Sequence, residues 1–287
     1  MIPSDYEVPN QWHEINTEQL TGTIIVIGPA DSGKSTLVQW LVKRLCQTHP
    51  CVGWLDGDIG QTTLGVPTTM NIALFEGAKD QLPRLLATFF VGSTSPRGHM
   101  GRLLDGLHRL QKLALATNAA AVVVDTTGMI DEHSGGDILK KKKIELLQPS
   151  TIIALQREQE LEHIIVPLKT EQRFNIYAFN PSEAVVRRSH EKRARRRRIR
   201  FHRYFQYAIQ HQIQHDALPV YGQTRPAKMS LMAFQDKMGF ALALGVVLSI
   251  SSESMEILTP LSDLSNVASL CFGALRLDPL TGEEVLK

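Results

Sequence analysis

The amino-acid sequence predicts an α/β fold in which a parallel sheet is covered by helices on both faces and followed by a small, mostly β C-terminal domain. In the first part of the chain, short β-branched runs alternate with helix-length amphipathic segments, which is typical of a parallel sheet. After about residue 215, short apolar runs are joined by polar turns and show no helical periodicity. We therefore expect two domains, at residues 1–215 and 216–287.

The elements of the first domain can be expected in order along the chain. The first apolar strand leads through a glycine-rich turn into a helix that begins near Ser35, where apolar residues recur at helical spacing. A second helix is expected at about 101–116, with leucines along one face. A third helix ends before Pro149, and we expect its four lysines, at 140–143, on a solvated face. The expected strands are TGTIIVIG (21–28), CVGWLDGD (51–58), FFVG (89–92), AAAVVVDTTG (119–128) and STIIALQ (150–156).

The composition excludes several classes of protein. The chain has 287 residues, of which 43% are hydrophobic and 21% charged, as in an ordinary globular protein. Its longest apolar run, at 240–250, is far shorter than the about 20 residues of a membrane-spanning helix. The N-terminal segment lacks the basic start and apolar stretch of a signal peptide. We therefore expect a cytoplasmic protein that has no membrane partner.

A glycine-rich motif joins the first strand to the first helix. The segment GPADSGKST (28–36) fits the pattern G-x-x-x-x-G-K-[ST] of a phosphate-binding loop, and the strand and helix around it are the context that this motif requires. The loop N–H groups would form an anion site, and no N-K-x-D or T-K-x-D tetrapeptide is present to read guanine. The sequence thus predicts a P-loop NTPase domain that favours ATP. The expected nucleotide-binding residues are Gly28, Asp31, Ser32, Gly33, Lys34, Ser35 and Thr36.

Three aspartates follow two of the expected strands. Asp56 and Asp58 stand in DGDIGQ, and Asp125 begins DTTG. The C-terminal ends of parallel strands meet at one edge of the sheet, so these carboxylates are expected near the γ-phosphate. Phosphoryl transfer needs one acid near Mg²⁺ and another to accept the proton of the attacking hydroxyl. We favour Asp58 as that base, with Asp56 as the alternative, and we expect Ser35, Asp56 and Asp125 around the metal.

A strongly basic segment, RRSHEKRARRRRIRFHR (187–203), follows. Ten lysines and arginines stand there against one acid, which gives a net charge of +9, whereas the whole chain carries +2. The segment contains no proline or glycine, which favours a helix, and such a density of charge favours a polyanionic partner. Arg193 and Arg197 share one helical face, whereas Arg195 and Arg198 point elsewhere. The segment is therefore expected to contact both a triphosphate and a nucleic acid.

Together these motifs resemble the polynucleotide 5′-hydroxyl kinase family. The resemblance rests on GPADSGKST, DGDIGQ, FVGSTSPRG, DTTG and an arginine-rich helix that ends in RFHRYF, and it spans roughly residues 20–205. It implies that ATP and Mg²⁺ are used to phosphorylate the 5′-hydroxyl end of RNA, DNA or both, and it leaves the protein partners unknown. The alternative is a nucleic-acid-binding ATPase switch that transfers no phosphate to the nucleic acid.

The resemblance also implies roles for individual residues. It implies that Lys34, Ser35 and Thr36 hold phosphates and metal, and that Asp58 or Asp56 activates the 5′-hydroxyl. In the family pattern, Gln61 helps to organise the water shell of the metal, Thr94 and Ser95 match a clasp, and Arg193 and Arg197 match an R-x-x-x-R lid at about 187–203. Met129 stands where family members often carry a tryptophan that stacks on the terminal base. The expected nucleic-acid contacts are Asp58, Met129, Arg195 and Arg198.

Overall fold

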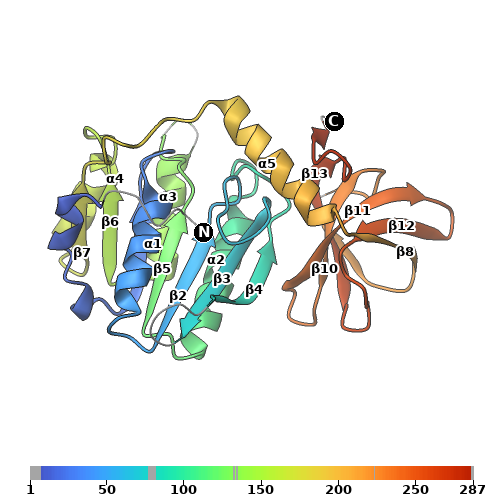
Figure 1. The fold of residues 1–287 in the computed structure, drawn as a ribbon, viewed down its shortest axis with the longest axis horizontal. Helices are drawn as coiled ribbons and strands as arrows, with labels where there is room; N and C mark the ends of the chain where they lie inside the picture. The colour runs from blue at the N-terminus through green and yellow to red at the C-terminus, as the bar shows by residue number, and fades with distance from the viewer. Residues whose placement is uncertain (1–7, 77–81, 132, 134, 223, 286–287) are drawn as a thin grey trace. The chain divides into compact units, whose positions relative to one another are not determined.

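The chain divides into two compact units. The computed structural model describes residues 8–76, 82–131, 133, 135–222 and 224–285 (Figure 1). The first unit comprises Met1–Asp58, Asn71–Leu86 and Met100–Arg188, and the second comprises Ile59–Met70, Ala87–His99 and Ser189–Lys287. Among the described residues, none of the helices has both the length and the apolar character needed to cross a bilayer.

The first sheet has seven strands, in the order β4-β3-β2-β5-β1-β6-β7. The pairs β1–β5, β1–β6, β2–β5 and β6–β7 are parallel, so the predicted α/β architecture with a largely parallel sheet is confirmed. Every residue of β5 and β6 is buried, as expected for strands that are covered on both faces. The strands are β1 (Gly22–Ile27), β2 (Cys51–Gly57), β3 (Thr69–Glu76), β4 (Arg84–Phe90), β5 (Ala121–Thr126), β6 (Thr151–Leu155) and β7 (Asn175–Phe179).

The sheet differs from the prediction at both edges: β7, which pairs with β6 at one edge, was not predicted. β3, which was not predicted, runs antiparallel to β2, and the strand expected at 89–92 begins earlier and ends at Phe90. The prediction depended on the alternation of strands and helices. An antiparallel strand needs no crossover helix before it, so this alternation does not reveal β3.

Helices cover both faces of the first sheet. α1 (Lys34–Leu45) packs against β1, β5 and β2, whereas α2 (Met100–Ala116) packs against β2, β5 and α3 (Gly136–Leu147). In Figure 1, α1 lies in front of the sheet and α2 lies behind it. Most of the leucines that predicted α1 and α2 are buried, whereas Leu104 and Leu113 of α2 are half-buried. Both helices are confirmed. The described part of this unit also contains the helices η1 (Asn10–Glu14), η2 (Thr17–Gln19) and α4 (Glu162–Thr170).

The second unit is built on a largely antiparallel sheet of order β14-β13-β10-β11-β12-β8, with β9 paired to β13. Successive residues of β10 enter two different apolar clusters, because side chains alternate between the faces of a strand. The C-terminal domain was expected to begin at residue 216, but the first strand of this sheet, β8, lies before that residue. Its strands are β8 (Ile209–Gln214), β9 (Val220–Gly222), β10 (Ser230–Gln235), β11 (Ala241–Ile250), β12 (Ser254–Thr259), β13 (Ser269–Leu277) and β14 (Glu284–Val285).

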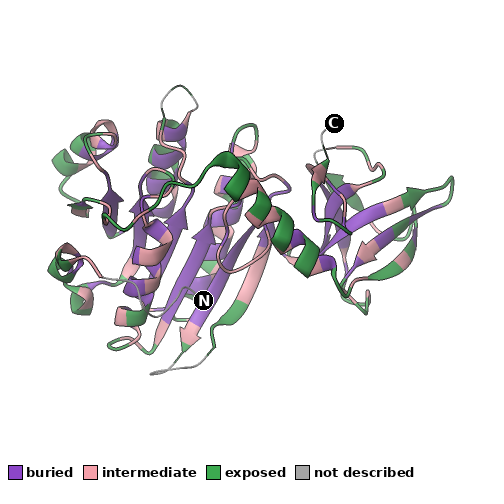
Figure 2. Cartoon of the chain, turned by 45° about the horizontal axis from the view of Figure 1, so that its top comes forward, coloured by how far each residue is buried: buried purple, intermediate pink, exposed green. Residues whose placement is uncertain are grey.

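The predicted arginine-rich helix is α5 (His190–Phe205). Its N-cap is Ser189, whose hydroxyl accepts a hydrogen bond from the backbone N–H of Lys192. Phe201 and Phe205 are buried in an apolar cluster with residues of β10, β11 and β13. Much of the remaining surface of α5 is exposed (Figure 2). The helix is therefore an integral part of the second unit.

Candidate functional site: a phosphate-binding loop and a pair of buried aspartates

The loop between β1 and α1 has the backbone of a phosphate-binding turn. Gly33, the N-cap of α1, has a φ of 92°, in the left-handed region that favours glycine. Asp31 also lies there, with a φ of 55°. Lys34 is buried, and its ammonium group donates to the carbonyl oxygen of Pro29 at 2.6 Å. The lysine is thus folded back over its own loop, and the first N–H groups of α1 lie at the end that attracts anions.

Two aspartates lie side by side at the carboxyl edge of the sheet. Asp56 of β2 and Asp125 of β5 are register partners on adjacent parallel strands, and both are buried. The hydroxyl of Ser35, in the first turn of α1, donates to Asp125 Oδ2 at 2.5 Å. Burial raises the pKa of the Asp125 carboxyl, and the negative charge of Asp56 raises it further, whereas Lys34 and Ser35 act in the opposite direction. A cation at this edge would relieve the repulsion.

Several buried polar atoms at this edge have no hydrogen-bond partner in the described structure. They are Ser32 Oγ in the loop, Asp125 Oδ1, and Thr127 Oγ1 immediately after β5. A buried polar group without a partner costs about 1–3 kcal/mol, so these atoms fit a site that is completed by a ligand.

The same donors fit a magnesium ion. No group of three or more His, Cys, Asp or Glu side chains in the described part of the chain could hold a metal by itself. Mg²⁺, however, is usually bound by one or two carboxylates together with substrate phosphates and water. A serine hydroxyl and an unpaired carboxylate oxygen beside a phosphate-binding loop match that pattern, so the residues present fit the expected ion.

The segment that precedes α5 passes close to the phosphate-binding loop within the first unit. The backbone N–H of Arg188 donates to Asp31 Oδ2 at 2.9 Å. A Cβ added to Gly33 would lie 3.5 Å from Cγ2 of Val185. Asp31, which was expected to contact the nucleotide, therefore also fixes the chain that leads to α5.

The arginines of α5 have partners within the second unit that the sequence did not predict. Arg197 forms an ion pair with Glu284, and Arg198 Nη1 lies 2.7 Å from Glu283 Oε1. Arg200 donates to the carbonyl oxygens of Thr62, Thr63 and Gly65. Arg195 is exposed. The lid and nucleic-acid roles expected of Arg193, Arg195, Arg197 and Arg198 stay predictions.

The other expected site residues fall into both units. Gln61, in the second unit, donates to the carbonyl oxygen of Gly60 at 2.8 Å and to that of Arg193 at 3.4 Å. Thr94 and Ser95 lie in a loop of the same unit, where Ser95 Oγ accepts a hydrogen bond from the backbone N–H of Arg97. Met129, half-buried, follows β5 in the first unit. Their predicted contacts with nucleotide and nucleic acid stay predictions.

A protein-family model covers both the phosphate-binding loop and α5. The family model described as "mRNA cleavage and polyadenylation factor CLP1 P-loop" matches residues 28–207, well over half of the chain. The chain belongs to this family. The resemblance inferred from the motifs is thereby confirmed.

Curated relatives of this CLP1 P-loop chain extend the match. A polyribonucleotide 5′-hydroxyl-kinase of Pyrococcus abyssi is 27% identical over 319 residues, which cover 91% of this chain and 89% of that protein. A polyribonucleotide 5′-hydroxyl-kinase of Pyrococcus furiosus is 34% identical over 166 residues, or 57% of this chain and 46% of that protein. A solved structure of the Clp1p–Pcf11p complex matches with a TM-score of 0.69 at 12% identity and covers 92% of this chain and 77% of that one. The last match shows a common fold.

Two lysines of the run on α3 do not lie on a solvated face, so this part of the prediction is wrong. Lys140 and Lys143 are completely buried, whereas Lys141 pairs at 3.5 Å with Asp137 and is half exposed. Residues 140 and 143 share the helical face that is turned inward, because they lie three positions apart. The three-residue spacing of Lys140 and Lys143 is visible in the sequence of this CLP1-family chain. A run of four lysines is nevertheless typical of a solvated face, so the spacing alone did not predict their burial.

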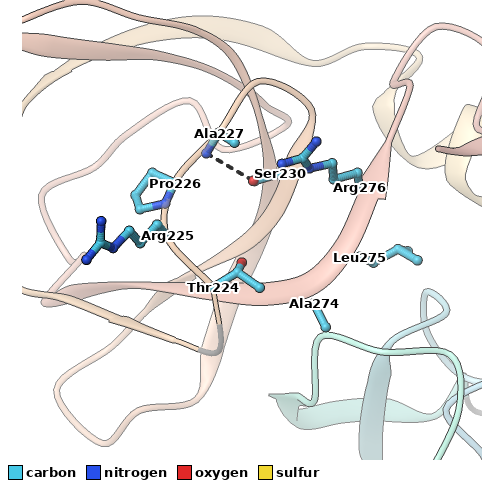
Figure 3. Close-up of a pocket in the computed structure, with 8 residues that line it drawn as sticks. All are labelled: Thr224, Arg225, Pro226, Ala227, Ser230, Ala274, Leu275 and Arg276. Carbon is cyan, nitrogen blue, oxygen red and sulfur yellow. Dashed lines mark hydrogen bonds between the residues drawn. The ribbon is translucent and has the colours of Figure 1, made fainter. Parts of the chain in front are cut away.

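A separate hollow of about 290 Å³ lies in the second unit. In Figure 3 the side chains of Arg225 and Arg276 point in different directions along it, and Ser230 Oγ accepts a hydrogen bond from the backbone N–H of Ala227 at 3.1 Å. Because the guanidinium groups do not converge, the hollow does not have the geometry of an anion site. It is lined by Thr224, Arg225, Pro226, Ala227, Ser230, Ala274, Leu275 and Arg276.

Proposed function

We propose that this chain is an ATP-dependent polynucleotide 5′-hydroxyl kinase, which transfers the γ-phosphate of ATP to the 5′-hydroxyl end of RNA. One observation carries the proposal: the Ser35–Asp125 contact joins the phosphate-binding loop to the end of β5, and β5 lies beside β2, which bears Asp56 and is followed by Asp58. The match to relatives named polyribonucleotide 5′-hydroxyl-kinases, over most of both chains, supports the same activity and favours RNA over DNA.

The nucleotide would lie along the loop and the N-terminus of α1. Loop N–H groups would bind its phosphates, and Lys34 would leave the Pro29 carbonyl to neutralise the β- and γ-phosphates. Ser35 and Asp125, with Asp56 beside them, would hold Mg²⁺. When bound, that ion supplies positive charge to the β- and γ-phosphate oxygens. These residues thus orient the γ-phosphorus for in-line attack.

The attacking group is the 5′-oxygen of the nucleic acid. A bond forms between this oxygen and the γ-phosphorus, the bond to the β–γ bridging oxygen breaks, and ADP leaves. A carboxylate must accept the hydroxyl proton from within hydrogen-bond reach. Asp56 is buried and adjoins Asp125, whereas Asp58 is partly exposed and its backbone N–H donates to Asp56 Oδ1 at 3.3 Å. Exposure to an incoming strand favours Asp58 as the base.

Positive charge on α5 would attract the nucleic-acid strand. The helix carries six arginines between positions 193 and 200, and the exposed Arg195 is available to phosphodiesters without breaking an ion pair that holds the fold. Electrostatic contacts of this kind make binding strongly dependent on salt.

The test is to incubate the protein with γ-labelled ATP, Mg²⁺ and matched RNA and DNA oligomers that carry either a 5′-hydroxyl or a 5′-phosphate. Label on the hydroxyl oligomers alone is expected, with RNA labelled faster than DNA. The Asp58→Asn variant should lose transfer but keep ATP binding. Released phosphate without labelled oligomer would instead identify a nucleic-acid-dependent ATPase switch.

A further inference from the structure

Five charged side chains are buried in the described part of the chain, and all five belong to the first unit. They are Lys34, Asp56, Asp125, Lys140 and Lys143. Burial of a charged group is costly unless hydrogen bonds or opposite charges compensate for it. Lys34, Asp56 and Asp125 belong to the site described above, but the two lysines of α3 have no role in it so far.

Lys140 holds the turn that follows Asp125. Its ammonium group donates to Thr126 Oγ1 at 2.8 Å and to the carbonyl oxygen of Thr127. Thr126 Oγ1 in turn donates to the carbonyl oxygen of Val26 at 2.7 Å. A chain of hydrogen bonds therefore runs from α3 through the end of β5 to the end of β1, two residues before the phosphate-binding loop.

The same turn packs directly on that loop. Gly128 approaches so closely that an added Cβ would lie 2.4 Å from the Cα of Ala30. A displacement of the turn would therefore move the loop backbone, the Asp125 carboxylate and the buried Thr127 hydroxyl together. Transfer reactions are sensitive to such displacements, since a misplacement of about 1 Å can cost about 10²-fold in rate.

We propose that Lys140 is a positioning residue for phosphoryl transfer, which fixes the Thr126–Thr127 turn against the phosphate-binding loop and so sets the distance between Ser35 and Asp125. This inference rests on the proposed kinase function. Lys140 contacts Thr126 and Thr127, and in this proposal it acts through these two residues without contact with the substrate.

Lys143 provides a matched control on the same helix. It lies three positions after Lys140 and is equally buried, but its ammonium group has no hydrogen-bond partner in the described structure. Lys140→Met and Lys143→Met each remove one buried amino group, whereas Lys140→Met alone cuts the link to the turn. A difference between the two variants therefore reports on the hydrogen bonds.

The first experiment compares these variants in transfer and in Mg²⁺-dependent ATP binding. Lys140→Met should lower kcat by about 10- to 100-fold, leave the KM for RNA within about twofold, and raise the Mg²⁺ concentration needed for half-maximal ATP binding. Lys143→Met should stay within about twofold of the wild type in all three. Equal losses in the two variants, or an unchanged kcat in Lys140→Met, would overturn the proposal.

A second pair of variants tests the chain of hydrogen bonds if Lys140→Met fails to fold. Thr126→Val removes the hydroxyl that joins Lys140 to Val26, and Thr126→Ser retains it. We expect a lower kcat in the valine variant and a kcat close to that of the wild type in the serine variant. Equal kcat values in the two variants would contradict a role for the chain of hydrogen bonds. A wild-type protein that labels no oligomer would refute the kinase function, but the Mg²⁺ dependence of ATP binding would still decide the role of Lys140.

Discussion

Replacement of Lys143 by methionine should change how stability depends on pH. Burial lowers the pKa of the Lys143 ammonium from its ordinary 10.5 to about 8; Asp58 and Asp125 oppose this shift, and Lys34 adds to it. Lys140, on the same helix, also loses basicity through its burial and through the charge of Lys143. One pKa unit corresponds to about 1.4 kcal/mol, so the buried ammonium costs about 3 kcal/mol below pH 8.

The direction of this pH dependence follows from proton binding. Between pH 8 and 10.5 the unfolded chain holds a proton on Lys143 that the folded protein has released. The free energy of unfolding contributed by this group therefore rises with pH over that window. Methionine is similar in length and uncharged. It therefore removes both the cost of the buried ammonium at lower pH and the rise of the free energy of unfolding between pH 8 and 10.5.

The assay is urea unfolding of nucleotide-free wild-type and Lys143→Met protein at several values between pH 7 and 10. We expect the variant to be the more stable protein at pH 7, by up to about 3 kcal/mol, and this difference to shrink toward pH 10. A difference that stays constant across the range, or a variant that is less stable at pH 7, would refute the account of Lys143 as a buried and unsatisfied ammonium.

Three other predictions concern the loop and the helix of arginines. Gly128→Ala should abolish ATP binding measured by calorimetry, because its Cβ would collide with the loop backbone, whereas Gly101→Ala in α2 meets open space and should bind normally. Lys34→Met should abolish transfer while thermal unfolding still shows a folded protein; full activity would remove the loop from the mechanism. Arg197→Ala should lower kcat far more than it raises the KM for ATP, and Glu284→Gln, which releases this arginine from its ion pair, should not lower kcat. Equal losses in those two variants would give Arg197 a structural role.

The parts of the fold that follow from local sequence were predicted well. The phosphate-binding loop depends on glycines and on flanking elements that are adjacent in the chain, and DTTG follows a β-branched apolar run that is typical of a buried strand. Asp56 and Asp125 were expected at one edge because parallel strands share that edge, and the structure places them in register.

Other parts depend on contacts between distant residues. The ion pairs of Arg197 and Arg198 join residues 87 and 85 positions apart, and no periodicity in the sequence reveals such partners. Lys140 and Lys143 belong to a run of four lysines, which is typical of a solvated face, but both are buried. Their burial follows from the direction in which α3 faces the sheet, which local patterning does not determine.

The central claim is tested most directly by locating the transferred phosphate. A 5′-hydroxyl RNA is incubated with the protein, γ-labelled ATP and Mg²⁺, and the product is digested to nucleotides. The account predicts that the label appears on the 5′-phosphate of the terminal nucleotide and that ADP forms in equal amount. Label found only as inorganic phosphate, with the 5′ end still a hydroxyl, would contradict it.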